Sequence, residues 1–213
     1  MNIQENLDQS VTEKYIGGII YINLDRRTDR RQEFEDQAKV YNLNCERFTA
    51  IPKSCGIVGC TYSHLSALKI ARERNYKNVL IMEDDFVFLV DKEQFEREIE
   101  QIFAHNVDFD VCMISYNLLN STESAEYPFL LRALDVQTAS GYIVNQHYYD
   151  KLINLLEYAA PLLEQTEEHW NYANDQVWKQ YQPHDKWYCT KTRIGRQRSG
   201  YSDNCERFCD YQV

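Results

Sequence analysis

The chain has 213 residues, of which 44% are hydrophobic and 26% are charged, with only 7 Gly and 4 Pro. This composition is that of a globular protein and excludes collagen-like, low-complexity and largely disordered classes. Its 33 acidic and 23 Lys or Arg side chains give a formal net charge of −10 at pH 7. Such a charge repels phosphate backbones, so we expect neither nucleic acid nor an anionic membrane as a partner.

The sequence predicts a cytoplasmic protein or, for a protein of viral origin, one in the host cytoplasm or the virion. No apolar run approaches the about 20 residues of a membrane span. The first ten residues, MNIQENLDQS, lack the apolar core of a signal peptide. Seven Cys cannot all pair within one chain, and without an export signal we expect mostly free thiols. The oligomeric state is left open.

We expect a polar N-terminal arm over residues 1–14 and a single domain over 15–213. Apolar, β-branched runs predict strands, and helical spacing or helix-forming residues predict helices. The predicted strands cover 15–23, 45–50, 79–82, 111–115, 130–136 and 141–144. The predicted helices cover 31–41, 63–74, 92–105, 148–163 and 172–181, with a turn at 56–61 and an irregular tail from residue 195.

The alternation of strands and helices predicts an α/β fold with a mostly parallel central sheet and helices on both faces. In such sheets, ligands bind beyond the carboxyl ends of the strands. Three polar clusters follow predicted strands, at residues 23–26, 83–85 and 115–117. We therefore expect these clusters to converge on one crevice.

The acids Glu83, Asp84 and Asp85 directly follow a predicted buried strand. Carboxylates this close repel one another, and a divalent cation removes that cost. Mg²⁺ and Mn²⁺ favour carboxylate oxygens and keep positions for phosphate oxygens. The triplet is therefore a candidate cation site, and a solvated acidic turn is the alternative.

Two further segments carry groups that suit a phosphate. Arg26, Arg27 and Arg30 follow the first predicted strand, and guanidinium groups bind phosphate well. A solvated helix start with Arg–Asp pairs is the alternative. Ser63 is a candidate N-cap for the helix that also holds His64, and a helix N-terminus favours anions. For His64, a structural role is the alternative.

The second half of the chain offers a candidate general base, Asp175, beside an aromatic residue. A helix cap is its alternative role. The polar tail 197–203 (QRSGYSD) is either a lid over a ligand or a plain loop. The motifs G-x-G-x-x-G, G-x-x-x-x-G-K-[ST] and G-x-S-x-G do not occur in the sequence. A dinucleotide oxidoreductase, a P-loop NTPase and an α/β-hydrolase are thus disfavoured.

Six short motifs, taken in order, resemble glycosyltransferase family 25, which includes lipopolysaccharide-synthesis transferases, collagen galactosyltransferases and relatives in large DNA viruses. They lie at 22–30 (INLDRRTDR), 59–64 (GCTYSH), 82–85 (MEDD), 138–144 (TASGYIV), 174–176 (NDQ) and 197–203 (QRSGYSD). The resemblance covers nearly the whole chain. The chain departs from it at Asn204, where many relatives carry Ile, and it has no second transferase domain.

The resemblance implies a GT-A type, Rossmann-like fold and an inverting transfer of a hexose, galactose or glucose, from a UDP-sugar. It implies Mn²⁺, or Mg²⁺, held by an acidic motif, and an acceptor hydroxyl on a glycan, a lipid-linked glycan or a protein. Asp175 is then the catalytic base, and the metal ligands are Glu83, Asp85 and Asp203. The expected nucleotide-sugar-binding residues are Asn23, Leu24, Arg26, Arg30, Ser63, His64, Asp84, Gln197 and Arg198.

Three other functions remain open at this stage. The first is a catalytically silent module of the same fold that binds a nucleotide or a glycan. The second is a different metal-dependent phosphotransferase or hydrolase that uses the acidic triplet. The third is an interaction protein with a zinc clip formed by Cys60, His64, Cys205 and Cys209, although their spacing matches no known zinc motif.

Overall fold

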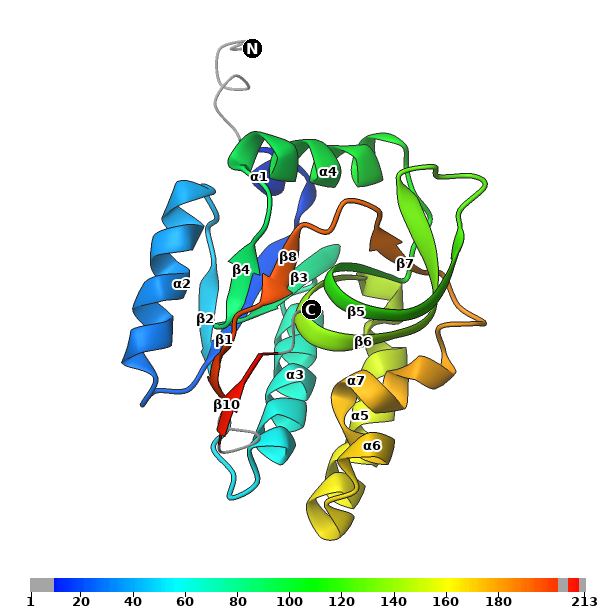
Figure 1. Ribbon diagram of the computed structural model, residues 1–213. Coiled ribbons are helices and arrows are strands. Elements are labelled where there is room, and N and C mark those ends of the chain that lie inside the picture. The colour runs from blue at the N-terminus through cyan, green and yellow to red at the C-terminus, as the bar shows by residue number, and fades with distance from the viewer. Residues whose placement is uncertain (1–9, 203–206, 211–213) are drawn as a thin grey trace.

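The computed structural model describes residues 10–202 and 207–210. Its central element is an eight-stranded sheet with strand order β2-β1-β3-β6-β7-β5-β8-β4, flanked by helices (Figure 1). The strands are β1 (Gly18–Asn23), β2 (Glu46–Thr49), β3 (Asn78–Glu83), β4 (Phe86–Phe88), β5 (Val111–Glu123), β6 (Leu130–Asn145), β7 (Trp187–Thr190) and β8 (Gly195–Gln197). A separate small hairpin pairs β9 (Gly200–Ser202) with β10 (Arg207–Cys209).

The helices that the structure describes alternate with these strands. They are α1 (Val11–Tyr15), α2 (Thr28–Val40), α3 (Gly56–Glu73), α4 (Lys92–Ala104), α5 (Tyr149–Thr166), α6 (His169–Tyr172) and α7 (Asn174–Val177), with 3-10 turns η1 (Gln146–Tyr148) and η2 (Trp178–Gln180). The short α1 covers the end of the expected polar arm, 1–14, and extends to Tyr15; it begins with a capping box between Ser10 and Glu13. No described helix is long and apolar enough to cross a bilayer.

The predicted fold class, a mostly parallel sheet with helices on both faces, is confirmed. Strand β1 pairs in parallel with β2 and β3, and β5 pairs in parallel with β7 and β8. Strand β6 runs antiparallel to β3, β5 and β7, and β4 runs antiparallel to β8. All strands of this sheet except β4 and β6 therefore point in one direction.

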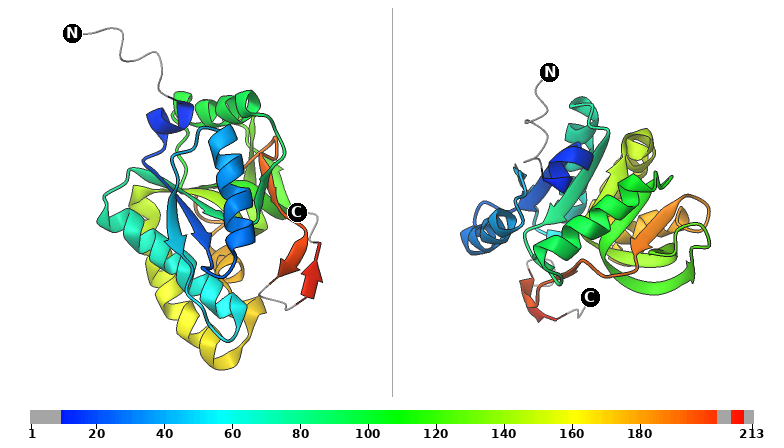
Figure 2. Two further views of the ribbon diagram at one scale, coloured as in Figure 1. Left: turned by 90° about the vertical axis from the view of Figure 1, so that its left-hand side faces the viewer. Right: turned by 90° about the horizontal axis from the view of Figure 1, so that it is seen from above.

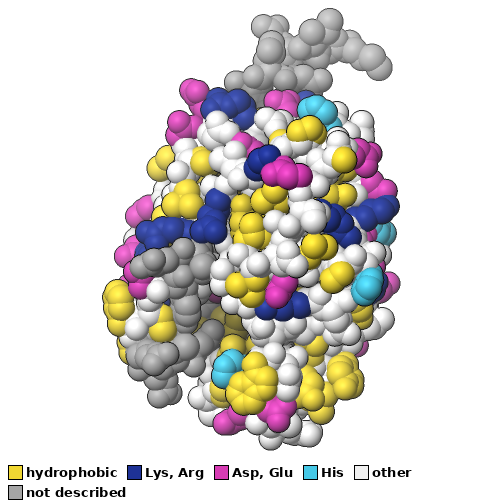
Figure 3. Space-filling model, turned by 45° about the vertical axis from the view of Figure 1, so that its right-hand side comes forward, with side chains coloured by type: hydrophobic (Ala, Val, Ile, Leu, Met, Phe, Trp, Pro, Cys, Tyr) yellow, Lys and Arg dark blue, Asp and Glu magenta, His cyan; other side chains and the backbone are white. Residues whose placement is uncertain are grey.

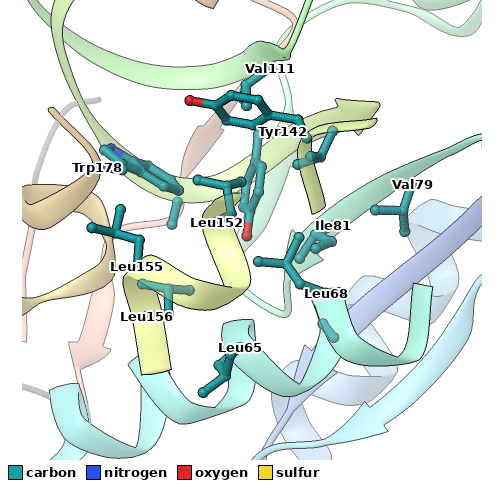
Figure 4. Packing of buried hydrophobic residues seen from close by; sticks show 14 of the residues in the cluster. Leu65, Leu68, Val79, Ile81, Val111, Tyr142, Leu152, Leu155, Leu156 and Trp178 are labelled. Atoms are coloured by element: carbon teal, nitrogen blue, oxygen red, sulfur yellow. The ribbon is translucent and has the colours of Figure 1, made fainter. Parts of the chain in front are cut away.

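The two faces of the sheet bury separate hydrophobic clusters. Along β3, Val79 and Ile81 face the cluster under α3 and α5, while Leu80 and Met82 face the cluster under α2 and α4. Figure 4 shows the first cluster, in which leucines of α3 and α5 meet Val79, Ile81 and Tyr142. The views in Figure 2 show α2 and α3 flanking the sheet. Burial on both faces explains why β3 is a continuous apolar run instead of an alternating pattern.

Several predicted boundaries are wrong for identifiable reasons. The predicted turn at 56–61 is the start of α3, whose N-cap is Cys55, so Ser63 lies inside the helix. Gly59 lies within this helix, where the lack of a side chain permits close packing: a Cβ there would lie 2.4 Å from the Ile51 carbonyl oxygen. The predicted helix over 172–181 is interrupted at Ala173, whose backbone is extended.

The remaining differences concern strands. The strands predicted at 130–136 and 141–144 are one strand, β6, whose register against β5 shifts along its length. The sequence did not predict β4 or β7, and the tail from residue 195 forms β8, β9 and β10 in place of an irregular segment. Short strands of three or four residues carry too little periodicity to be recognised without their partners.

We predict that Gly195→Ala destabilises the fold by overpacking. A Cβ at this position would lie 2.1 Å from Cζ of the buried Phe86 ring. The free energy of unfolding, measured by urea denaturation, should fall by about 1–3 kcal/mol. Gly200→Ala is the control, because a Cβ there has no atom within 4 Å. Equal stability of the two variants would contradict the packing argument.

Candidate active site

Two pockets share a wall beside the carboxyl ends of β1 and β3. The first pocket is lined by residues that include Leu24, Arg26, Arg30, Asp85 and Gln197. The second has a volume of about 310 Å³ and is lined by residues that include Asn117, Thr138 and Asp175. Cys60, Glu83 and Gln197 line both pockets. The clusters at 23–26 and 83–85 meet at the first pocket, whereas of the cluster at 115–117 only Asn117 is a lining residue, and it lines the second pocket. The single crevice that the sequence predicted is thus two pockets with a shared wall.

An ion-pair cluster forms one wall of the first pocket. β3 ends at Glu83, and the chain then turns so that Asp84 and Asp85 point back toward α2. Nη1 of Arg30 lies 3.1 Å from Oδ1 of Asp84 and 3.2 Å from Oδ2 of Asp85. The same guanidinium donates through Nη2 to the Tyr201 carbonyl oxygen at 2.7 Å. One cation from α2 thus holds both acids and also the tail of the chain.

Further contacts of the two aspartates come from β1, from β8 and from the residue that follows β8. Asn23, at the end of β1, donates through Nδ2 to Oδ2 of Asp84 at 2.6 Å. Gln197 donates through Nε2 to Oδ2 of Asp85 at 3.0 Å, and the Arg198 amide donates to the Asp85 carbonyl at 2.7 Å. The other carboxylate oxygen of Asp85, Oδ1, is buried and has no hydrogen-bond partner among the described residues.

At this wall the negative charge of the acidic side chains exceeds the positive charge of Arg30. Burial, with the neighbouring Glu83 charge, raises the pKa of Asp85 to about 7. Burial also raises the pKa of Asp84, although Arg30 and Asn23 oppose that effect. Two buried aspartates therefore share one guanidinium, and the part of the wall next to Asp85 favours an added positive charge.

Glu83 faces a different set of groups. Its Oε1 lies 3.0 Å from Nε2 of His64 and 3.9 Å from Sγ of Cys60. Nδ1 of His64 lies 2.8 Å from the hydroxyl oxygen of Tyr142. Within the described part of the chain, Cys60, His64 and Glu83 form a trio whose ligand atoms all lie within 4.8 Å of one another.

Asp175 lies at the start of α7 and faces the second pocket. Its Oδ2 accepts a hydrogen bond from the Thr138 amide at 3.0 Å. Thr138 has φ = 79°, which is unusual for a β-branched residue and costs backbone energy. That conformation directs the amide toward the carboxylate. Burial raises the pKa of Asp175 above that of an ordinary aspartate.

The structure brings most of the predicted donor-binding residues to the first pocket. Leu24, Arg26, Arg30, His64, Asp84 and Gln197 all line it. Asn23 is buried behind this wall and also accepts a hydrogen bond from Nε of Arg47 at 3.0 Å. Its contact with the pocket therefore runs through Asp84.

Two predicted donor-binding residues are placed elsewhere. Ser63 is buried in α3, donates to the Gly59 carbonyl at 2.6 Å and accepts from the Ile51 amide at 2.8 Å, so it holds the preceding loop. The Arg198 side chain pairs with Glu33, and only its backbone amide reaches the acidic cluster. Neither residue is among those that line the two described pockets.

The predicted metal ligands are split by the structure. Asp85 belongs to the ion-pair cluster, Glu83 belongs to the trio, and Asp203 lies outside the described residues. In the alternative zinc clip, Cys60 and His64 do meet, but Glu83 completes the described trio with them. Cys205 also lies outside the described residues.

Sequence reasoning missed the polar groups of the second pocket, among them Gln137, Thr138 and His169. Thr138 and Gln137 lie in β6, at the gap that had been left between the two predicted strands. An interruption of polar residues inside an apolar strand pattern is the one available signal for such a position. Residues 138–144 form one of the matched motifs, but the sequence predicted no site role for Gln137 or Thr138.

We predict that Arg30→Met destabilises the protein strongly, because it leaves Asp84 and Asp85 buried without their cation. The free energy of unfolding at pH 8 should fall by about 3–5 kcal/mol. The matched control is Arg72→Met, which removes an exposed Arg72–Asp150 pair of similar length, 2.9 Å, and should cost no more than about 1 kcal/mol. Similar losses in both variants would show that the Arg30 cluster has no special role in stability.

Comparison with known proteins identifies similar folds and no sequence family. No protein-family model matches the sequence, and no curated protein matches it. A solved structure with a similar fold is described as a glycosyltransferase involved in the glycosylation of the major capsid of PBCV-1. It is 11% identical over 89% of this chain and 95% of its own, with a TM-score of 0.51.

Two further solved structures align at lower TM-scores. A197 from STIV is 10% identical over 85% of this chain and 93% of its own, with a TM-score of 0.46. The galactosyltransferase LgtC, solved with donor and acceptor sugar analogs, is 11% identical over 80% of this chain and 72% of its own, with a TM-score of 0.42. The fold of this chain is thus similar to that of a solved viral-capsid glycosyltransferase.

Proposed function

We propose that this chain is a glycosyltransferase that moves a hexose from a UDP-sugar to an acceptor hydroxyl with inversion. The observation that carries the proposal is the pair of pockets with a shared wall, one bounded by arginines and Asp85 and the other by Asp175. A direct displacement needs a stabilised leaving group on one side of the reacting carbon and a base on the other. The fold shared with a glycosyltransferase supports this assignment.

The first pocket suits the nucleotide diphosphate of the donor. Arg26 and Arg30 offer guanidinium groups that match phosphate oxygens. Lys53 lines the same pocket and is paired with Glu164 at 2.7 Å. Leu24 and Pro52 supply apolar surface for the base and sugar of the nucleotide. The pocket therefore combines anion-binding groups with an apolar wall, which is what a nucleotide requires.

The residues present also fit a divalent cation, Mn²⁺ or Mg²⁺. The unpartnered buried oxygen of Asp85 offers a ligand position, and the surplus of carboxylates favours a cation there. Asp85 and Glu83 would hold the ion, with Asp203 as the third proposed ligand. When bound, the cation neutralises negative charge on the departing diphosphate.

Asp175 is the proposed base in the second pocket. The Thr138 amide holds one carboxylate oxygen and so fixes the direction of the other. Asp175 takes the proton of the acceptor hydroxyl as that oxygen bonds to the anomeric carbon and the bond to the UDP oxygen breaks. The raised pKa makes this carboxylate a stronger base than an exposed aspartate. A single displacement of this kind inverts the anomeric centre and needs no covalent enzyme intermediate.

The proposed acceptor is a hydroxyl group on a glycan, a lipid-linked glycan or a protein. The second pocket presents amide side chains from Asn117, Gln137 and Gln176 around Asp175. Gln137 is itself positioned by Lys179, whose Nζ lies 2.8 Å from its Oε1. Amide groups both donate and accept hydrogen bonds, which suits the hydroxyl groups of a sugar.

We predict that UDP stabilises the protein against heat only when Mn²⁺ is present. Ligand at 100 times its Kd adds about 2.7 kcal/mol to the folded state. The measurement is a thermal-shift panel of UDP, GDP, CMP and ADP, each with Mn²⁺ and with EDTA. Asp85→Asn should lose the Mn²⁺-dependent part of the UDP shift, because the proposed ligand oxygens change. A shift with another nucleotide would overturn the donor, and no shift at all would contradict the donor pocket.

We predict that Asp175→Asn keeps the UDP shift and lowers sugar transfer by at least about 10²-fold, because an amide cannot accept the proton. Transfer is measured as UDP released from UDP-galactose and UDP-glucose with a panel of glycan acceptors. Asp150→Asn, at an exposed aspartate on α5, is the matched control and should retain full transfer. Full transfer by Asp175→Asn would remove Asp175 from the base role. UDP binding by the wild-type protein without transfer or hydrolysis would favour the catalytically silent module.

A further inference from the structure

The Cys60–His64–Glu83 trio is built like a metal site, and the proposed transfer gives no role to the Cys60 thiol or to the contact between His64 and Glu83. Cys60 and His64 lie four residues apart on α3, so their side chains leave the same face of that helix. Glu83 reaches them from the end of β3. The three ligand atoms lie within 4.8 Å of one another at the wall that the two pockets share.

The donor set of the trio differs in chemistry from the acids around Asp85. Mg²⁺, Mn²⁺ and Ca²⁺ favour oxygen ligands, whereas a thiolate with an imidazole favours zinc and similar transition metals. A dication bound to a thiolate, a neutral imidazole and a carboxylate forms a neutral unit. That neutrality suits this location, because His64 is fully buried and the nearby acids already carry surplus negative charge.

The surroundings of His64 meet a second requirement of a metal ligand. A ligating histidine almost always has its other ring nitrogen held by a hydrogen bond, which fixes the orientation of the ring. Nδ1 of His64 lies 2.8 Å from the hydroxyl of Tyr142, a buried residue of β6. Tyr142 therefore holds the ring so that Nε2 points at Glu83, 3.0 Å away.

Two of the three separations within the trio are close to those of a tetrahedral zinc site. Zinc bond lengths predict separations of about 3.4 Å between nitrogen and oxygen ligands and about 3.6 Å between sulfur and oxygen ligands. The corresponding distances here are 3.0 Å from His64 to Glu83 and 3.9 Å from Cys60 to Glu83. Both differ from those values by a few tenths of an ångström. Because Cys60 and Glu83 line both pockets, a fourth position would open toward a bound molecule.

We propose that Cys60, His64 and Glu83 bind a thiophilic divalent metal ion of the zinc class, at a position separate from the oxygen-ligated cation at Asp85. On binding, the Cys60 thiol releases its proton to solvent and its sulfur bonds to the metal, while His64 binds as the neutral imidazole. Glu83 is a proposed ligand in both metal sites, whereas Cys60 is a ligand only in the trio. The test therefore detects metal that is bound to the Cys60 sulfur.

The test is a titration of metal-free, reduced protein with Co²⁺ in the absence of nucleotide. We expect one equivalent of Co²⁺ to produce a near-ultraviolet thiolate-to-cobalt charge-transfer band, and one equivalent of Zn²⁺ to abolish it. Cys60→Ser should lose the band. Cys55→Ser is the matched control, because Cys55 is a free thiol at the N-cap of the same helix, and it should keep the band.

Two further variants make the result specific. His64→Gln should weaken Co²⁺ binding by at least about tenfold. Asp85→Asn removes the proposed donor cation site and should nevertheless keep the band. The Co²⁺ test therefore gives its answer even if the proposed transfer function is wrong. Circular dichroism confirms that each variant is folded. Absence of the band in the wild-type protein, or an equal band in Cys60→Ser, would overturn the proposal and leave the trio as a hydrogen-bonded chain that orients Glu83.

Discussion

The placement of Arg30 between Asp84 and Asp85 is the interaction on which the rest of the site depends. It joins the first helix after β1 to the turn after β3, and Asn23 and Gln197 complete the network from two other strands. Removing one partner of such a cluster leaves buried charge without compensation, which costs more than the pair contributes as a whole. Each of the two aspartates is thus held by more than one partner, while Oδ1 of Asp85 has no hydrogen-bond partner among the described residues.

The sheet topology places the second pocket next to this cluster. β6 runs antiparallel between β3 and β5, so its residues reach the shared wall from the direction opposite to the other central strands. Tyr142 and Thr138 of that one strand hold His64 and Asp175 respectively. Figure 3 shows a hollow in the surface on this face of the molecule. β6 thus positions His64 at the first pocket and Asp175 at the second.

The sequence predicted the fold class and the first pocket well, because both depend on local patterns. The apolar run of β3 followed by three acids is recognisable without any partner, and so are the arginines after β1. Thr138 was not recognised, because a β-branched residue is normally extended and its positive φ depends on tertiary packing. The trio was missed as a unit because Glu83 joins Cys60 and His64 only through the pairing of distant elements. Ser63 shows the converse, since a residue typical of helix caps lies inside the helix and binds the preceding loop.

The contact between Arg30 and the Tyr201 carbonyl ties the tail of the chain to the charge balance of the first pocket. A guanidinium has a limited number of N–H groups, and a phosphate group competes for the same ones. Occupation of the pocket by an anion therefore draws on the donors that now hold β9. β9 is held by the guanidinium groups of Arg27 and Arg30, which both line the first pocket, so an anion bound in that pocket would compete with the Tyr201 carbonyl for the same donors.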